Sequence, residues 1–249
     1  MLADKENSNL DTDVLNIGAV RVAYGEKQVL DEVEFAVNAG ETFGLIGLNG
    51  VGKTTLIKSV LGLRNVDSGS IAIKGYQPND VKARVGFAYL PERFDPPPFL
   101  TGMEFIKFSL SLYKTPFNEE AAYKAAELLA LDPQALKNRM HTYSKGMRQK
   151  VGLLATFLTG CELLILDEPM SGLDPKARAL VKRMLVEARN EGRTVFLSSH
   201  ILSDMNEICD RVAVLHATKI QYIGTPEGLR KQGKDENLEK AFLNLIDSK

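Results

Sequence analysis

The sequence predicts an α/β fold with a mostly parallel sheet, an antiparallel β region before it and an inserted helical segment. The parallel sheet is predicted by short runs that are apolar on both faces and mostly separated by helical patterns, at 42–46, 85–90, 163–166 and 194–198. Such runs are typical of buried parallel strands. The inserted segment is predicted by an almost entirely helical pattern between the second and third runs.

The amino-terminal part divides into a polar lead-in and the β region. Residues 1–13 are rich in Asp, Asn, Lys and Ser, and we expect them to fray. Residues 14–37 read as short strands broken at Gly25 and Asp31, which indicates an antiparallel sheet. The sequence has no signal-peptide core and no apolar run of about 18 residues, so we expect a soluble, cytoplasmic chain.

Helix-start signals mark the inserted segment, which we place at 92–158. They are the capping box of Thr101 and Glu104, the caps Asn118 and Ser144, and Pro133 in the first turn after Asp132. We expect one domain over 14–230, with a β region and core at 14–91 and 159–224 and this helical subdomain between them. In the tail, 231–249, helical spacing of apolar residues predicts a short helix packed on the body: Leu238, Ala241, Phe242 and Leu245.

Composition excludes several classes of function. The 249 residues carry 31 basic and 32 acidic side chains, so no strong field favours nucleic acid or an anionic membrane surface. Cys161 and Cys209 lie far apart and outside any metal-ligand spacing, which indicates neither a disulfide framework nor a zinc site.

The strongest motif follows the apolar run 42–46. Gly47, four further residues and then Gly52, Lys53 and Thr54 match the P-loop pattern, with an amphipathic helix after it. Backbone N–H groups of such a loop converge on phosphate at a positive helix end. We expect Lys53 to reach the β- and γ-phosphates and the Thr54 hydroxyl to ligate Mg²⁺. The alternative is a glycine-rich turn with a solvated lysine.

This motif predicts a P-loop NTPase (RecA-like) core that binds ATP. The expected nucleotide-binding residues are Gly47, Leu48, Asn49, Gly50, Val51, Gly52, Lys53, Thr54 and Thr55.

Two carboxylates, Asp167 and Glu168, end the apolar run 163–166, at the sheet edge where open α/β folds hold ligands. We expect Asp167 to orient the hydrated Mg²⁺ and Glu168 to polarise the attacking water. An acid at a strand end can also be purely structural. His200 follows the run 194–198 and should reach the same edge, where an imidazole can contact the γ-phosphate; most lone histidines are structural, the interpretation that we give His141 and His216.

The segment 143–149, Tyr-Ser-Lys-Gly-Met-Arg-Gln, resembles the signature motif of ATP-binding cassette (ABC) proteins. The order of elements matches this family over about residues 14–230: P-loop, Glu92 at the glutamine-loop position, signature, Asp167 and Glu168, the segment 171–174, then His200. Tyr143, Lys145 and Met147 depart from the usual Leu-Ser-Gly-Gly-Gln. The variant looks like that of ATPases that pair with separate export-type membrane subunits.

The resemblance implies further site residues. Ser144 and Gly146 would bind the γ-phosphate held by the P-loop of a second copy, although Ser144 taken alone is a helix cap. Tyr24 matches the adenine-stacking aromatic, with simple packing as the alternative. Glu92 would ligate Mg²⁺ or water, or remain a solvated loop charge. Asp174 would cap a helix through 188 and communicate across the dimer.

The leading hypothesis is therefore an ATP-hydrolysing subunit of an ABC transporter. Two copies would sandwich two ATP molecules and drive integral membrane permease subunits in export, with the chain peripheral at the inner face of the cell membrane. A soluble ABC ATPase acting on nucleic acid or ribosomes is the alternative, and one cassette with a net charge of −1 weighs against it. A P-loop kinase or GTPase would leave 143–149 and His200 unexplained, and we expect no nucleic-acid partner.

Overall fold

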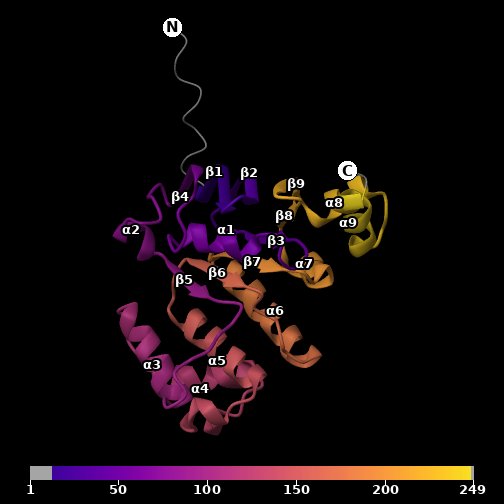
Figure 1. Ribbon diagram of the computed structural model, residues 1–249. Coiled ribbons are helices and arrows are strands. Elements are labelled where there is room, and N and C mark those ends of the chain that lie inside the picture. Colours follow the sequence, from indigo (N-terminus) through magenta and orange to yellow (C-terminus); the bar gives the residue numbers. More distant parts are fainter. Residues whose placement is uncertain (1–12, 248–249) are drawn as a thin grey trace.

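The computed structural model describes residues 13–247, in two β-sheets and a helical lobe (Figure 1). The strands are β1 (Asp13–Tyr24), β2 (Lys27–Asn38), β3 (Thr42–Ile46), β4 (Ser68–Ile73), β5 (Phe87–Leu90), β6 (Leu163–Asp167), β7 (Thr194–Ser199), β8 (Arg211–His216) and β9 (Lys219–Gly224). The α-helices are α1 (Lys53–Val60), α2 (Val81–Arg84), α3 (Gly102–Leu112), α4 (Glu119–Leu128), α5 (Lys145–Leu158), α6 (Pro175–Asn190), α7 (Leu202–Ile208), α8 (Pro226–Gly233) and α9 (Leu238–Asp247), with 3₁₀ turns at Pro133–Lys137 and Met140–Thr142.

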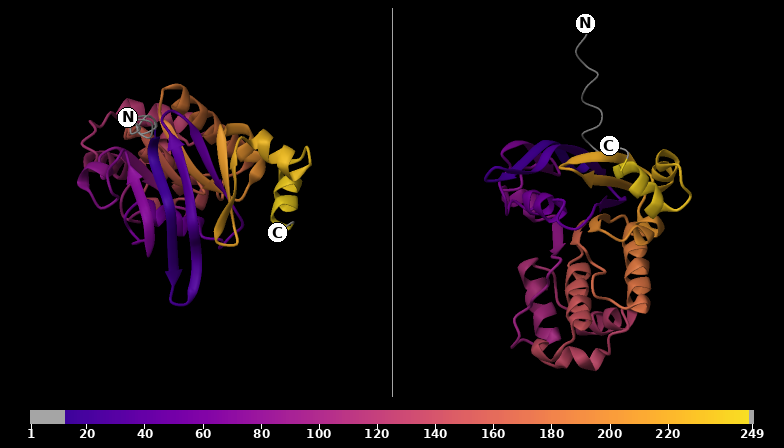
Figure 2. Two further views of the ribbon diagram at one scale, coloured as in Figure 1. Left: turned by 90° about the horizontal axis from the view of Figure 1, so that it is seen from above. Right: turned by 45° about the vertical axis from the view of Figure 1, so that its right-hand side comes forward.

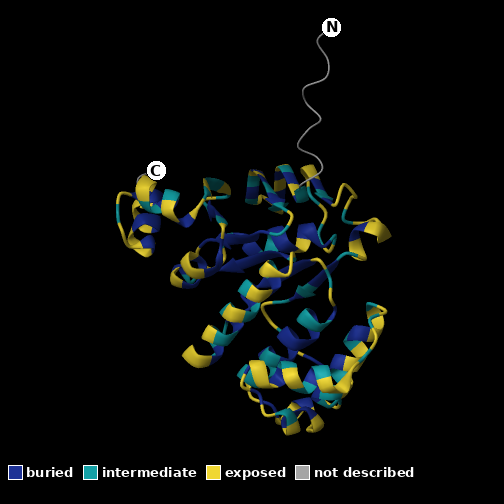
Figure 3. Cartoon of the chain, turned by 180° about the vertical axis from the view of Figure 1, so that it is seen from behind, coloured by how far each residue is buried: buried dark blue, intermediate teal, exposed yellow. Residues whose placement is uncertain are grey.

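A six-stranded sheet of order β5-β6-β7-β3-β8-β9 carries the site. Its neighbours from β5 to β8 pair in parallel, and β9 joins the edge antiparallel to β8. Every residue of β3, β6 and β7 is buried, as their apolar sequences require, and Figure 3 shows this layer in dark blue. The prediction of an α/β fold with a mostly parallel sheet is confirmed. Since parallel strands share one carboxyl edge, the residues after β3, β6 and β7 gather there.

The antiparallel sheet, of order β2-β1-β4, differs from the prediction at one point. The break at Gly25 is present, and Gly25 has a φ of 61° in the turn between β1 and β2. The break predicted at Asp31 is wrong, because β2 continues through it. Glu32 takes a φ of 52° where the register with β1 shifts, so a β-bulge absorbs the irregularity. Arg21 and Lys219 hold the Asp31 carboxylate, at 3.0 Å and 3.1 Å.

The structure adds strands to those predicted and shortens one. β4 joins the antiparallel sheet, and β8 and β9 extend the parallel sheet beyond β3. The predicted run 85–90 begins as a strand only at Phe87, because Val85 still belongs to the end of α2 and is exposed.

All the predicted caps of the helical lobe are present. The Thr101 hydroxyl accepts a hydrogen bond from the Glu104 N–H, and the Glu104 carboxylate accepts one from the Thr101 N–H. Asn118, Asp132 and Ser144 likewise accept from N–H groups of the turns that follow them. Helices α3 and α4 pack on α5, and Figure 2 shows this lobe projecting away from the sheets.

The carboxyl-terminal segment folds into α8 and α9, which pack on each other and, through α9, on α7. The predicted terminal helix is present, and most apolar side chains of α9 are buried: Leu238, Ala241, Phe242, Leu245 and Ile246. No helix between residues 13 and 247 is long and apolar enough to span a bilayer. The predicted fraying of 1–13 falls outside the described residues except at Asp13, which begins β1.

Candidate functional site

The loop between β3 and α1 requires glycine at two positions. A Cβ on Gly47 would lie 2.7 Å from the Leu215 carbonyl oxygen of β8. Gly52 has a φ of 121°, and a Cβ there would lie 3.0 Å from Leu30. The loop is thus wedged between β8 and β2. At its end, α1 has no side-chain cap and no acidic residue in its first turn, so its N–H groups and positive dipole are left for an anion.

A cleft of about 250 Å³ opens over this loop. Its lining combines loop residues with two carboxylates from other parts of the chain: Val29, Asn49, Gly50, Gly52, Lys53, Thr54, Thr55, Glu92 and Glu168. The structure therefore brings Glu92, which follows β5, to the same cleft as the P-loop. The two carboxylates of the cleft would repel a polyanion such as a nucleotide phosphate. Lys53 and the positive end of α1 offset this negative charge, so a polyanion is expected to bind next to them.

Three charged or titratable side chains converge at the edge of the cleft. Lys53 is buried and donates to the carbonyl oxygens of Gly47, at 2.7 Å, and Leu48, at 3.3 Å. Its Nζ also lies 3.4 Å from Oε1 of the buried Glu168. The second oxygen, Oε2, lies 2.9 Å from Nδ1 of His200. Glu168 is thus held between a cation and an imidazole whose ring is 42% exposed toward the edge.

Asp167 is fully buried beside this group. Its Oδ1 accepts from the Ser198 hydroxyl at 2.5 Å, whereas Oδ2 has no hydrogen-bond partner. Burial raises the pKa of this carboxyl, and the hydroxyls of Ser198 and Thr54 partly oppose the rise. Mg²⁺ prefers oxygen ligands. The unpartnered Asp167 oxygen and the hydroxyl of the neighbouring Thr54 are two such ligands, so these residues fit the ion.

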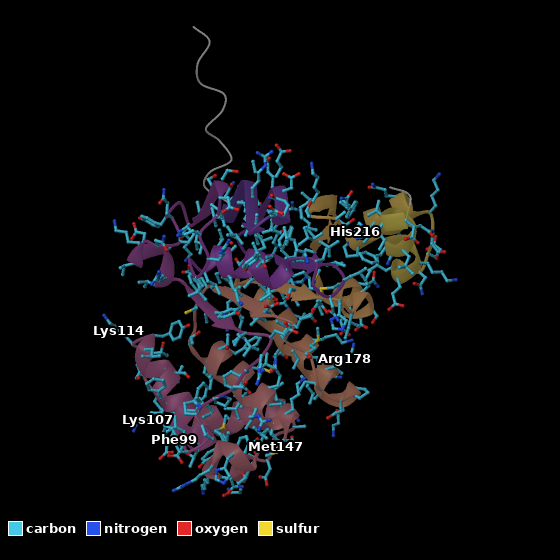
Figure 4. The ribbon with its side chains drawn as sticks, viewed as in Figure 1. Phe99, Lys107, Lys114, Met147, Arg178 and His216 are labelled. Atoms are coloured by element: carbon cyan, nitrogen blue, oxygen red, sulfur yellow. The ribbon has the colours of Figure 1, made fainter. Side chains whose placement is uncertain are left out.

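The three predicted nucleotide-binding residues that lie outside the P-loop are also outside the cleft. Ser144 and Gly146 occupy the start of α5 in the helical lobe and do not line the cleft; Figure 4 shows their neighbour Met147 on that lobe. There the carbonyl oxygen of Gly172 lies 3.5 Å from a Cβ built on Gly146. Tyr24, at the end of β1, is half-exposed, outside the cleft lining, and covered by the Arg64 guanidinium at 4.5 Å.

Other residues named in the sequence analysis have the following local geometry. Gly50 takes a φ of 78° in the P-loop. Asp174 caps α6 by accepting from the Ala177 N–H at 2.9 Å. His141 contacts the Pro98 carbonyl oxygen, and His216, labelled in Figure 4, ends β8.

Sequence reasoning missed two residues that connect the site. Ser198 lies opposite Asp167 in the register of β6 and β7, and its hydroxyl also accepts from the Glu168 N–H at 3.1 Å. A polar residue at the end of a second buried strand was the signal for it. The buried Gln149 donates to the Pro169 carbonyl oxygen at 3.0 Å. This contact ties α5 to the chain that follows Glu168.

Comparison with known proteins gives one consistent family. Residues 30–171, more than half of the chain, match the ABC transporter model. The chain is 37% identical over 229 residues to an uncharacterized ABC transporter ATP-binding protein of Synechocystis sp., a match that covers 87% of this chain and 65% of that protein. It therefore spans just under two thirds of that relative's length.

Two further matches extend over most of the chain. The Nod factor export ATP-binding protein I of Rhizobium leguminosarum is 31% identical over 237 residues, covering 91% of this chain and 74% of that one. A solved ATP-binding subunit of an ABC transporter is 33% identical with a TM-score of 0.84, covering 93% of this chain and 99% of that one. The P-loop, the carboxyl edge of the sheet and these matches agree, and the chain belongs to the ABC transporter family as one of its ATP-binding proteins.

Proposed function

We propose that the chain binds ATP with Mg²⁺ in the cleft over the P-loop, hydrolyses it, and thereby drives integral membrane permease subunits in export. The observation that carries the chemical part is the position of Glu168, held between Lys53 and His200 at the edge of that cleft. A buried carboxylate beside a phosphate-binding loop is a suitable base for water that attacks the γ-phosphate in line.

Each residue has a distinct part in this proposal. Lys53 exchanges its contacts with loop carbonyl oxygens for the β- and γ-phosphate oxygens, which also relieves its pairing with Glu168. Glu168 then accepts the proton of the attacking water, and His200 keeps its carboxylate in place and stabilises charge on the γ-phosphate. When bound to the Thr54 hydroxyl and the Asp167 carboxylate, Mg²⁺ would neutralise charge on the phosphates. Glu92 is close enough to the cleft to ligate that ion or a water.

A second copy of the chain supplies the rest of the site. Ser144 and Gly146 are outside the cleft of their own chain but begin a helix whose first N–H groups suit a phosphate. In a homodimer that sandwiches two ATP molecules, this end would meet the γ-phosphate on the partner's P-loop. Tyr24 would offer its half-exposed ring to the adenine.

An apolar groove in the helical lobe supports the proposal that the chain binds membrane subunits. It has a volume of about 180 Å³, lies between α3, α5 and β5, and is lined largely by aromatic and apolar side chains: Tyr89, Leu90, Phe94, Phe105, Leu112 and Tyr113. Phe108 and Leu112 of α3 are exposed beside it, whereas the exposed Phe99 precedes α3 and is labelled at the other end of the same lobe in Figure 4. Large exposed apolar side chains around a groove suit a short helix of a permease subunit. Such contacts would hold the chain at the cytoplasmic face of the membrane, and the printed name of the Rhizobium relative supports export.

Glu168→Gln tests the chemical part. The amide keeps the shape of the side chain but is a poor base, so we expect ATP binding to persist and hydrolysis to fall by about 10² to 10⁴. Equilibrium binding of labelled ATP and release of phosphate measure the two quantities on the same preparation. Unchanged turnover would remove Glu168 from the mechanism. Co-purification tests the choice of partner. A membrane protein that co-purifies with the chain would identify the permease. A nucleic acid that co-purifies in place of a membrane protein would favour a soluble ABC ATPase that acts on nucleic acid or ribosomes.

A further inference from the structure

His200 lies in a link of two residues between β7 and α7. The helix that follows has seven residues and no side-chain cap at Ile201. Within the link, the Ile201 N–H donates to the hydroxyl of Ser199. Because only Ile201 separates His200 from α7, the position of α7 constrains where the His200 ring can lie.

Glu168 is joined to α6 by a longer link, residues 169–174. The Ser171 N–H donates to the Glu168 carbonyl oxygen at 3.0 Å, and Asp174 caps the first turn of α6. Glu168 itself takes a φ of 48°, a left-handed conformation that costs energy for a residue with a Cβ. Its conformation is therefore maintained by the structure on either side, including α6.

A partly buried ion pair, in which Arg178 is 28% exposed and Asp204 is buried, connects these two helices near their amino-terminal ends. Nη2 of Arg178, in the first turn of α6, lies 2.5 Å from Oδ2 of Asp204, in the first turn of α7. The Asp204 side chain is only 4% exposed, and Lys182 Nζ lies 3.5 Å from its other oxygen. Figure 4 shows Arg178 where α6 approaches α7. A bonded carboxylate at this depth fixes the two helices more firmly than a surface pair would.

These contacts close a ring: Glu168 leads to α6, Arg178 binds Asp204 on α7, and α7 leads back to His200, which contacts Glu168. We propose that Arg178 and Asp204 are positioning residues that hold the His200 ring against the Glu168 carboxylate. Neither touches the cleft. The proposal rests on the proposed ATP hydrolysis for its catalytic consequence, but the geometry that it asserts lies within a single chain and can be measured without nucleotide.

The chain offers a matched control. Arg189, in the last turn of α6, lies 2.7 Å from Asp210, two residues after the end of α7, and their side chains are 31% and 40% exposed. Asp210 also accepts from the Thr42 N–H at 2.9 Å, so loss of Arg189 leaves it with a partner. Arg189→Gln removes an ion pair between α6 and the segment that follows α7, at the ends of these helices away from the site.

Nitrogen NMR of the histidine rings tests the geometry without nucleotide. The chain has three histidines, and loss of one signal in His200→Gln assigns that ring. Glu168→Gln defines the shift that accompanies loss of the carboxylate contact. We expect Arg178→Gln to move the His200 signals in the same direction and Arg189→Gln to leave them in place. His200 signals that are the same in Arg178→Gln and the wild type would overturn the proposal.

Kinetics of the full chain test the consequence. We expect Arg178→Gln to lower kcat for ATP hydrolysis by about tenfold with KM nearly unchanged, and Arg178→Lys to recover part of the loss. In a His200→Ala background Arg178→Gln should have no further effect, because the ring that it positions is gone. An equal loss in that background would show a merely structural role and contradict the proposal. If Arg178→Gln does not fold, Arg178→Lys and Asp204→Asn provide the same comparison.

The two tests separate the hypotheses. A wild-type chain that hydrolyses no ATP, even with its membrane partner, contradicts the proposed function, while the NMR comparison still decides the positioning role.

Discussion

The carboxyl edge of the sheet and the start of α5 both belong to the proposed nucleotide site, but they are built differently. At the sheet edge, Asp167, Glu168 and Lys53 are buried and contact one another within the chain. At the start of α5, Ser144 is exposed, its hydroxyl caps its own helix, and it is not among the residues that line the cleft. Buried charge has to be compensated inside the chain, whereas an exposed helix end folds without a ligand. The comparison teaches that one half is held together by contacts within the chain, whereas in the proposed site the other half would act on a second molecule.

The largest expected effect comes from breaking the exposed half. Ser144→Arg places a bulky side chain where a second copy would dock, so we expect steady-state hydrolysis to fall by about 10² or more, while ATP binding to the single chain is kept. Phosphate release and equilibrium ATP binding measure the two. Asn118→Arg, which removes a cap from α4 in the same lobe, is the matched control and should hydrolyse ATP normally.

Mixtures of two variant chains test whether Ser144 acts on the partner's nucleotide. Lys53→Ala chains should lose the nucleotide on their own P-loop, and mixed dimers with Ser144→Arg chains should keep at most one competent site. A Ser144→Arg chain that hydrolyses ATP at the wild-type rate would contradict action in trans.

The second-largest expected effect concerns the stability that the folded chain loses by burying the Asp167 carboxylate at the sheet edge. Because burial raises the pKa of Asp167 above its ordinary value, the folded chain holds this proton more tightly than the unfolded chain does. Its contribution to stability is therefore complete below the unfolded pKa and is lost as pH rises through the folded pKa. Asp167→Asn removes the buried charge, so at neutral pH we expect Tm of the nucleotide-free chain to rise by roughly 2–5 °C, while Mg²⁺-dependent ATP binding weakens.

Thermal unfolding between pH 4 and pH 8 measures the difference in Tm between Asp167→Asn and the wild type. This difference should become smaller toward pH 4, where the wild-type carboxyl is protonated as well. A Tm for Asp167→Asn at or below the wild-type value at pH 8 would show that the charge is compensated better than its orphaned oxygen indicates.

The sequence predicts local features of both halves but not the contacts between distant segments. The P-loop, the two carboxylates and the helix caps depend on spacing over a few residues, and the structure has those strands, turns and caps where the pattern puts them. The break at Asp31 is wrong because a β-bulge, a feature of strand pairing, takes up the turn-like residues. The contact of Ser198 with Asp167 and the ion pair of Arg178 with Asp204 join residues 31 and 26 positions apart, so local pattern does not contain them.

The smallest expected effect comes from a substitution in the helical lobe that should lower stability and leave ATP binding unchanged. Thr101→Ala removes half of the capping box of α3 and should cost about 1 kcal/mol, which lowers Tm by roughly 2–4 °C. ATP binding at the cleft should stay unchanged, because α3 contributes none of its lining. Thermal unfolding and ATP binding on one preparation check both, and a parallel loss of affinity would show that the two regions are coupled before a second copy docks.

The most direct test of the two-half account is the size of the Glu168→Gln chain with and without ATP, with the membrane partner absent. This variant binds nucleotide without consuming it, so the account predicts a dimer by size-exclusion chromatography with light scattering when ATP and Mg²⁺ are present and a monomer when they are removed. Adding Ser144→Arg to the same chain should abolish the dimer while ATP stays bound. A Glu168→Gln chain that binds ATP as a monomer, or a dimer that Ser144→Arg leaves intact, would contradict the claim that the site is completed by a second copy.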